Sequence, residues 1–207
     1  MDKWEWKREL KHLYQPKPGV VGEVDVPAMN FVMADGDGDP NTSAAFAEAV
    51  GALYGVSYTL KFDLKKAGIG PEYSVMPLEG LWWAEDLDAA FTADGGDRSS
   101  WKWTVMIAQP PHVTAAQVET ARLGAVAKGK VPEGMALRFE EYAEGPSVQI
   151  MHLGPFATEA DDIRALHAHI TQMGARPGKA HHEIYLSDPS RTAPEKMKTV
   201  IRQPYVK

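Results

Sequence analysis

The stretch from Ser147 to Gly174, SVQIMHLGPFATEADDIRALHAHITQMG, decides the fold. Its first six residues alternate between the two sides of an extended chain, which is typical of a β-strand. After the turn at Gly154-Pro155, apolar residues recur at three- and four-residue spacing, which predicts a helix. We expect Thr158 to cap this helix and Gly174 to end it.

The same order of elements occurs in both halves of the chain. Strands at residues 182–186 and 197–202 complete the second half. The first half has, in order, a strand at 29–33, a turn at 35–40, a helix capped by Ser43, and strands at 73–83 and 101–107. A helix from Thr114 to about Lys128 and a strand at 137–142 follow before the second half repeats the order.

Both halves therefore read strand–helix–strand–strand. Their identity is too low to prove a repeat, but the shared order and the Gly-Pro or Gly-Asp-Pro turn after each first strand favour duplication. We expect an α+β fold with a duplicated strand–helix–strand–strand unit, antiparallel sheets, helices over one face and a ligand cleft between the repeats. Residues 1–19 are expected to form an N-terminal helix or arm. Residues 20–207 are expected to form a single domain of two repeats, at about 20–112 and 132–207.

Composition narrows the classes of function. The chain has 207 residues, 44% of them hydrophobic, which is enough for a sizeable core. Its net charge of -6 argues against a nucleic-acid partner, because such proteins carry a basic footprint. The absence of cysteine excludes disulfides, zinc–thiolate sites and cysteine nucleophiles. No signal peptide or membrane-length apolar run is present, so we expect no membrane partner and a cytoplasmic location.

No motif predicts a metal or cofactor site. Residues 35–39 resemble the start of a calcium loop, but the position where such a loop needs glutamate is Phe46. The chain has no phosphate-binding loop, no dinucleotide-binding glycine motif and no nucleophile elbow. The adjacent pair His181-His182 would point to opposite faces of a strand, and the histidines at 167 and 169 diverge on a helix. We therefore expect no metal ion and no cofactor.

The last predicted strand pair places a glutamate among apolar and aromatic residues. Side chains alternate along a strand, so His181, Glu183 and Tyr185 share one face, which suits the floor of a cleft. The other face suits the core beneath the helices and carries His182, Ile184 and Leu186. A glutamate in an apolar cleft has a raised pKa and can act as a general base or bind a cation. The pattern alone leaves open that Glu183 lies solvated on an exposed sheet face.

Six tryptophans are many for a chain of this length, and four of them fall in two strand pairs. Trp82 and Trp83 are adjacent, so one faces each side of the strand, whereas Trp101 and Trp103 share a face. Indole rings offer flat apolar surface to planar or cationic ligands. The alternative for each ring is a place in the core. The ligand-binding candidates are Trp82, Trp83, Trp101, Trp103, Met106 and His181.

Two stretches resemble a known family. They are Pro77–Trp83 (PLEGLWW) and His181–Lys196 (HHEIYLSDPSRTAPEK). Through them the chain resembles the GyrI-like small-molecule-binding proteins from about Val20 to its end, and is similar to the stand-alone members, some of which hydrolyse cyclopropane-bearing DNA-alkylating compounds. The resemblance implies an aromatic pocket between two strand–helix–strand–strand units, with Glu183 as the pocket glutamate.

Three hypotheses on function follow. In the first, an enzyme, Glu183 takes a proton from a water that attacks a strained electrophile, and Tyr142 or Tyr185 donates a hydrogen bond to the oxygen where charge develops. The second is a module that binds small lipophilic or cationic molecules without turnover. The third, ranked last, is a protein that protects an intracellular target by contact. No pattern marks an oligomeric interface, so the oligomeric state is left open.

Overall fold

The computed structural model describes residues 3–84, 98–178 and 180–207. The N-terminal segment holds β1 (Lys3–Trp4), α1 (Trp6–Glu9) and α2 (Lys11–Tyr14). The first half then contains β2 (Gly22–Val26), β3 (Met29–Asp37), α3 (Ala44–Ala67), β4 (Glu72–Tyr73), β5 (Leu78–Trp83), the 3-10 turn η1 (Arg98–Ser100) and β6 (Lys102–Ala108). The second half contains α5 (Ala115–Ala127), β7 (Arg138–Tyr142), β8 (Gly145–Leu153), η2 (Phe156–Thr158), α6 (Ala160–Gln172), β9 (Arg176–Pro177), β10 (His181–Tyr185), η3 (Pro194–Lys196) and β11 (Lys198–Val206).

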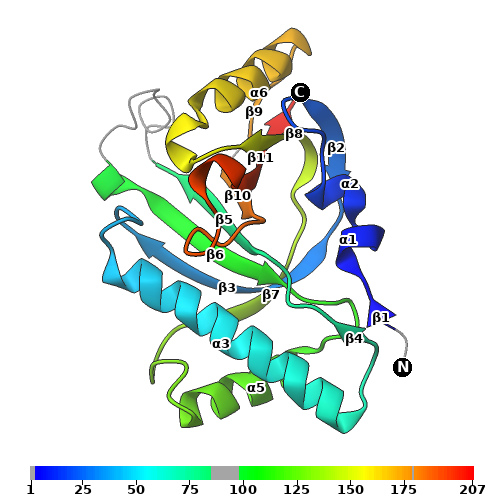
Figure 1. The fold of residues 1–207 in the computed structure, drawn as a ribbon, viewed down its shortest axis with the longest axis vertical. Coiled ribbons are helices and arrows are strands. Elements are labelled where there is room, and N and C mark those ends of the chain that lie inside the picture. Colours follow the sequence, from blue (N-terminus) through cyan, green and yellow to red (C-terminus); the bar gives the residue numbers. More distant parts are fainter. Residues whose placement is uncertain (1–2, 85–97, 179) are drawn as a thin grey trace.

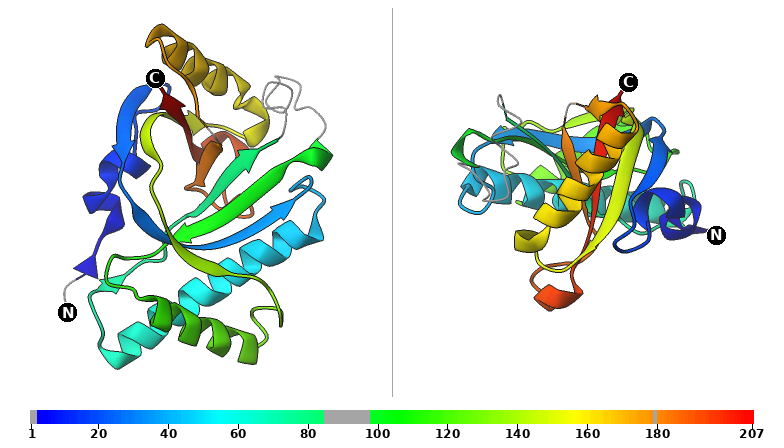
Figure 2. Two further views of the ribbon diagram at one scale, coloured as in Figure 1. Left: turned by 180° about the vertical axis from the view of Figure 1, so that it is seen from behind. Right: turned by 90° about the horizontal axis from the view of Figure 1, so that it is seen from above.

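One curled antiparallel sheet runs through the molecule in the order β2-β8-β11-β10-β5-β6-β3-β7, with β9 beside β11 (Figures 1 and 2). This order is symmetric about the central pair β5–β10. The two halves have the same sequence of elements, β3-α3-β5-β6 and β8-α6-β10-β11, and each contributes an outer strand, β2 or β7, to the edge of the other. A separate parallel pair, β1–β4, joins the N-terminal segment to the body.

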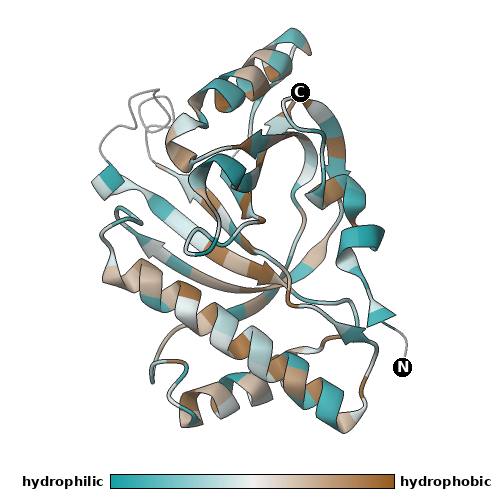
Figure 3. Cartoon of the chain, in the orientation of Figure 1, coloured by the Kyte–Doolittle hydropathy of each residue, from teal (hydrophilic) through white to brown (hydrophobic). Residues whose placement is uncertain are grey.

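Helix α6 lies over the face of the sheet that carries Glu183. Residues paired directly across neighbouring strands share a face, and Glu183 pairs with Ile201 of β11. Ile201 belongs to a buried apolar cluster with Leu166 and Ile170 of α6. Figure 3 shows hydrophobic and hydrophilic residues alternating along α6, as expected of a helix with one buried side.

Helix α3 covers the same face on the other side of the β5–β10 pair (Figure 1). The ring of its residue Phe46 lies 5.7 Å from the ring of Trp82. Trp82 is two positions along β5 from Gly80, which pairs directly with Glu183, so both lie on the Glu183 face. The two helices therefore flank the central strands on one side of the sheet.

The opposite face, which carries His182 and Ile184, is covered by the N-terminal segment. Arg202 on this face donates a hydrogen bond of 2.7 Å to the carbonyl of Leu13. His182 and Ile184 are core residues as predicted, but the helices over them are the short α1 and α2, whereas α3 and α6 cover the Glu183 face. The prediction is wrong for Leu186. Leu186 follows the end of β10 and lines the cleft described below. Alternation groups side chains by face, but the docking of the helices decides which face is covered.

Most helix ends follow local signals. The side chains of Ser43 and Thr114 each accept a hydrogen bond from the backbone N–H three residues on, which confirms both as helix starts. Gly174 follows α6 with a φ of 70°, a left-handed conformation that glycine adopts at little cost, and ends it as predicted. Thr158 does not cap α6. It lies in η2, and the N-cap residue is Glu159, which makes no side-chain cap hydrogen bond.

Two strand boundaries differ from the sequence prediction. The strand expected at 73–83 is divided into β4 and β5, and β4 pairs outside the main sheet. Strand β3 continues to Asp37, through part of the expected turn, because it pairs with β6 as far as Lys102. No helix in residues 3–84, 98–178 and 180–207 is long and apolar enough to span a membrane.

Candidate active site

A cleft of about 1300 Å³ lies between the two helices, over the central strands. Strands β5 and β10 form its floor, α3 one side, and η2 with the start of α6 the other. A groove beside the N-terminal segment continues from it. The lining of the central part includes Phe46, Tyr54, Leu78, Trp82, Trp101, Phe156, Glu159, Glu183 and Tyr185.

Gly80 makes room for the cleft beside Glu183. The two residues pair directly on β5 and β10. The Trp82 indole lies against Gly80, where an added Cβ atom would meet its Nε1 at 2.8 Å. Because Gly80 has no side chain, the indole and the Glu183 carboxylate lie over the same part of the floor. The Glu183 side chain keeps 16% of its surface exposed.

Two polar groups contact the Glu183 carboxylate, and a third holds one of them. The Nε2 atom of His181 lies 3.4 Å from Glu183 Oε1. Burial, the charge of Glu183 and a hydrogen bond to it raise the pKa of Tyr185 well above its ordinary value. The Tyr185 hydroxyl therefore keeps its proton and donates to Glu183, while it accepts a hydrogen bond of 3.2 Å from Trp82 Nε1. This chain of contacts holds the carboxylate in place without covering it.

Aromatic rings form the walls of the cleft. The Trp82 ring lies 5.9 Å from that of Trp101 and 5.7 Å from that of Phe46. On the other side, Phe156 meets Tyr185 edge to face at 5.6 Å. Rings at these separations pack on one another and leave apolar surfaces for a ligand. A planar apolar or cationic molecule fits this lining.

A second carboxyl group, Glu159, lies in the same cleft and was missed by the sequence reasoning. The residue is 4% exposed, and its Oε1 has no hydrogen-bond partner within the part of the chain that the structure describes. Burial, followed by the negative charge of Glu183, raises the pKa of Glu159 to about 9. Periodicity carries no signal for this residue, because Glu159 sits between a turn and a helix. The one signal in the sequence is its position, because Glu159 is an acidic residue shortly after the predicted turn at Gly154-Pro155.

Hydrogen bonds among Thr158, Pro155, His152 and Asp162 hold the turn that precedes Glu159. The Thr158 hydroxyl donates to the carbonyl of Pro155 at 2.8 Å and lies 3.2 Å from His152 Nε2. The other ring nitrogen of His152 lies 2.7 Å from Asp162 Oδ2. The residue types resemble a hydrolytic triad, but the single proton of Thr158 is directed to Pro155. This set is better explained as a support for η2 and Glu159 than as a nucleophile.

The structure brings together four of the candidates named from the sequence. Glu183, Tyr185, Trp82 and Trp101 line the cleft. Trp103 shares their face but is 1% exposed beneath Phe46, and its ring packs against Gly36, where an added Cβ atom would meet it at 2.2 Å. His181 is buried behind Glu183 and does not line the cleft.

Three other candidates do not reach the cleft. Met106 pairs with Glu79, and Trp83 with Lys102, so both point to the face opposite Glu183. Tyr142 pairs with Met29 at the edge of the sheet and also points to that face. Its ring packs at 6.3 Å against Phe31 in the core. Tyr142 is therefore not placed to act on a ligand beside Glu183, whereas Tyr185, the other tyrosine candidate, lies in the cleft.

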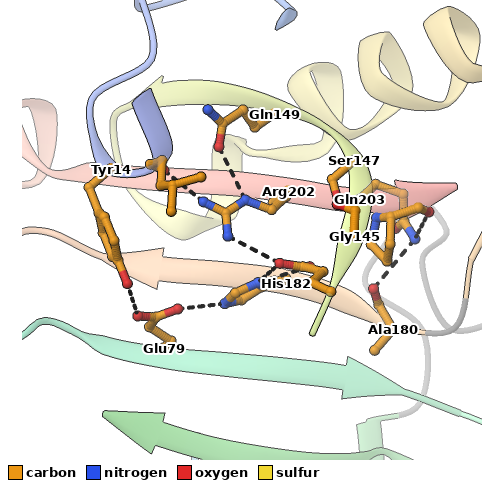
Figure 4. A network of polar contacts seen from close by, with 12 residues as sticks. Tyr14, Glu79, Gly145, Ser147, Gln149, Ala180, His182, Arg202 and Gln203 are labelled. Carbon is orange, nitrogen blue, oxygen red and sulfur yellow. Dashed lines mark hydrogen bonds and ion pairs between the residues drawn. The ribbon is translucent and has the colours of Figure 1, made fainter. Parts of the chain in front are cut away.

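The face opposite the cleft holds a buried network of charged residues (Figure 4). Tyr14 donates to Glu79 at 2.7 Å, and Glu79 lies 3.0 Å from His182 Nε2. The Nδ1 atom of His182 lies 3.0 Å from Glu144, which also accepts a hydrogen bond of 3.1 Å from Arg202. Two carboxylates thus face two cationic side chains. The network links the N-terminal segment to β5, β10 and β11.

Opposite charges set the protonation of this network. Burial alone would lower the pKa of His182, but the charges and hydrogen bonds of Glu144 and Glu79 outweigh it and raise the pKa to about 9. Burial would raise the pKa of Glu144, but His182 and Arg202 together lower it to about 2. His182 is therefore protonated at neutral pH, and both of its ring nitrogens donate. Among the described residues, no group of three or more histidine and acidic side chains is arranged to hold a metal ion.

Comparison with known proteins identifies a family and several structures that are similar to this chain. The model of the GyrI-like small molecule binding domain matches residues 21–205. An uncharacterized conserved protein from Listeria innocua is 37% identical, with a TM-score of 0.86 over 99% of this chain and 100% of that one. A hydrolase from the same organism is 36% identical, with a TM-score of 0.85 over 99% and 100% of the two chains.

More distant structures share the fold alone. The C-terminal domain of EcmrR is 10% identical, with a TM-score of 0.53 over 94% of this chain and 99% of that one. No curated protein matches the chain. Because the family model spans nearly all of the sequence, this chain belongs to the GyrI-like small molecule binding domain family.

Proposed function

We propose that this protein binds planar, lipophilic small molecules in the cleft and hydrolyses those that carry a strained electrophilic ring. The observation that carries the proposal is the position of Glu183. Its carboxylate lies on the floor of an aromatic cleft, is held by Tyr185 and stays open beside Gly80. A carboxylate placed in this way can accept a proton from a water next to a bound ligand.

In the proposed reaction the ligand lies between the rings of Trp82 and Trp101 on one side and Phe156 on the other. Glu183 takes a proton from a water molecule, whose oxygen forms a bond to the CH₂ carbon of a cyclopropane. The substrate is one whose cyclopropane is conjugated with a carbonyl group. A carbon–carbon bond of the ring breaks, and its electron pair moves through this conjugated system to the carbonyl oxygen. General-base catalysis supplies roughly 10²–10⁴-fold, and the release of ring strain adds to the driving force.

Two observations support hydrolysis as the class of reaction. A hydrolase from Listeria innocua is similar to this chain over nearly its whole length. The sequence resemblance to hydrolases of cyclopropane-bearing compounds rests on the stretch that contains Glu183 and Tyr185.

The second candidate is a protein that binds lipophilic cations without turnover. It is favoured by the presence of two carboxyl groups, Glu183 and Glu159, among aromatic rings. The faces of such rings attract cations, and a carboxylate adds a counter-charge.

The two candidates are separated by incubation with a cyclopropane-bearing alkylating agent in ¹⁸O-labelled water, followed by mass spectrometry. We expect the wild type to form a product that has gained one labelled water, and Glu183→Gln to lose roughly 10²–10⁴-fold of this activity. Tyr142→Phe, on the opposite face, is the control and should keep it. Recovery of unchanged compound with the wild type, together with quenching of tryptophan fluorescence, would favour the binding protein.

A further inference from the structure

Glu159 is a second acid in the cleft, and its surroundings differ from those of Glu183. It comes from the turn before α6, on the wall opposite α3, whereas Glu183 comes from the floor. Glu159 is 4% exposed and has a buried Oε1 without a hydrogen-bond partner in the described residues. An ionised carboxylate in such a position is costly, because burial removes water and Oε1 gains no hydrogen-bond donor among the described residues. The neutral, protonated acid is the form that suits this position.

The charged and polar groups that face Glu159 from the neighbouring elements act on its pKa in opposite directions. Glu183 on β10 and Asp162 on α6 are negative and oppose a further negative charge, whereas Arg98 on η1 and the Thr199 hydroxyl favour it. Burial and Glu183 dominate and raise the pKa of Glu159 to about 9. A buried carboxyl group kept neutral in the same cleft as a more exposed one is a usual arrangement of a general acid and a general base.

We propose that Glu159 is the general acid of the reaction in which Glu183 is the base. The inference rests on the proposed function and adds the step that completes it. As water attacks and the carbon–carbon bond breaks, the electron pair arrives on the carbonyl oxygen of the ligand. Glu159 gives its proton to that oxygen, which becomes a hydroxyl group, and Glu183 holds the proton taken from water. Transfer of one proton from Glu183 back to Glu159 restores the site, so that one water is added overall.

The fold provides the rigidity that this role requires. Glu159 follows directly on η2, which is held by contacts among Thr158, Pro155 and His152, and His152 is bound in turn by Asp162. The Phe156 ring packs on Tyr185, so the turn that carries Glu159 also contacts the residue that holds Glu183. The two acids are thereby held on elements that touch each other.

The test uses the pH profile of ring opening in the wild type, in Glu159→Gln and in the control Asp161→Asn. Asp161 is the matched control because it is a neighbouring carboxylate on α6 with an 88% exposed side chain. A general acid works only when protonated, so the wild-type rate should fall as the pH rises through about 9. We expect Glu159→Gln to be roughly 10²-fold slower or more and to lose this alkaline limb, and Asp161→Asn to keep both rate and profile.

Infrared difference spectroscopy supplies a readout that does not depend on turnover. The carbonyl band of a protonated carboxyl group should be present at neutral pH in the wild type and absent in Glu159→Gln. In Glu183→Gln the band should disappear at lower pH than in the wild type, because a neighbouring negative charge has been removed.

Each outcome bears on a different claim. A Glu159→Gln variant with the wild-type rate and profile would overturn the role of Glu159 and leave the proposed hydrolysis standing. A wild type without ring opening would overturn both, and the infrared band would then identify Glu159 as a buried neutral carboxyl without a catalytic role. A wild type that lacks the band at neutral pH, with Glu159→Gln still slow, would also overturn the acid role, since Glu159 would have no proton to give.

Discussion

His182 and Glu183 are neighbours in the chain, yet they lie on opposite faces of the sheet, which differ in how their charges are paired and in what covers them. On the His182 face each charge meets an opposite one: His182 lies between Glu79 and Glu144, and Arg202 binds Glu144. On the Glu183 face two acids share a cleft; Glu183 is held by Tyr185 and His181, whereas Glu159 Oε1 has no hydrogen-bond partner among the described residues. Paired buried charges are typical of structural networks, whereas acids short of partners in a cleft are typical of functional sites.

The difference arises from what covers each face. The N-terminal segment closes the His182 face, where Tyr14 and the Leu13 carbonyl complete the network. On the Glu183 face a cleft lies between α3 and the turn before α6, and Gly80 has no side chain to fill the space beside Glu183. One strand thus contributes to a buried structural network with one face and to the floor of a candidate ligand site with the other.

The largest expected effect is on the network. Arg202→Met should lower the free energy of unfolding by about 3–5 kcal/mol, because it leaves Glu144 buried beside one cation instead of two. Urea denaturation measures the change. The control is Arg138→Met, whose exposed ion pairs with Asp35 and Glu140 should contribute about 0–1 kcal/mol. An equal decrease in the free energy of unfolding in the two variants would mean that the buried network stabilises the fold no more than exposed ion pairs do.

The next effect is a dependence of stability on pH. The folded pKa of His182, about 9, lies above its ordinary value of 6.5, so folding binds a proton between these values. The His182 contribution is therefore fully present below pH 6.5 and is lost as the pH rises through about 9, a change on the order of a few kcal/mol.

The acid limb has the opposite sign. The folded pKa of Glu144, about 2, lies below its ordinary 4.5, so its contribution is present above pH 4.5 and is lost as the pH falls toward 2. Urea midpoints across the pH range measure both limbs. The folded pKa of Glu159, about 9, also lies above its ordinary 4.5, so its contribution is lost as the pH rises from 4.5 through about 9, and the His182 limb is best measured in Glu159→Gln. A flat profile between pH 6.5 and 9 in that variant would contradict the protonated state of His182.

A smaller loss of stability, with a large loss of function, is expected for Gly80→Ala. The new Cβ atom would meet Trp82 Nε1 at 2.8 Å, so the indole must move and the space beside Glu183 is filled. Overpacking of this kind costs about 1–3 kcal/mol. Ligand-induced quenching of tryptophan fluorescence should weaken in the variant. Gly51→Ala, where an added Cβ atom on α3 has open space, serves as the control. Full ligand binding by Gly80→Ala would show that the opening is not needed.

The smallest effect on stability is expected for Glu183→Gln. Its side chain is partly exposed, and removal of its charge removes one of the causes that raise the pKa of Glu159, so the free energy of unfolding should stay within about 0.5 kcal/mol or rise. Urea denaturation tests this beside Arg202→Met. A loss as large as that of Arg202→Met would place Glu183 among the structural charges and remove the contrast between the two faces.

Some of the site could be predicted because it depends on local geometry. Strand alternation put Glu183 and Tyr185 on one face and His182 on the other, and the register of β10 agrees. The same rule could not say which tryptophan lines the cleft. Trp103 shares the face of Trp101 but is covered by Phe46, a residue of α3 that is remote in the sequence.

Other parts of the site escaped prediction because they depend on distant segments. Tyr142 was a candidate for the site, but the pairing of β7 with β3 turns it toward Phe31. Glu159 was not a candidate, because the direction of a side chain in a turn follows from how that turn docks. Glu144, which completes the network at His182, lies in a connection between strands that shows no periodicity.

By itself the sequence determined the order of the long strands and helices apart from β2, most helix ends, and the division of β10 into two faces. These features follow from hydrogen bonds between residues close together in the sequence and from the alternation of side chains along an extended backbone. Only the tertiary structure decided that the helices cover the Glu183 face, that the N-terminal segment closes the His182 face, and that Glu159 meets Glu183 in one cleft. These features depend on pairing between residues far apart in the chain, where the burial of apolar surface and the matching of charges are settled together.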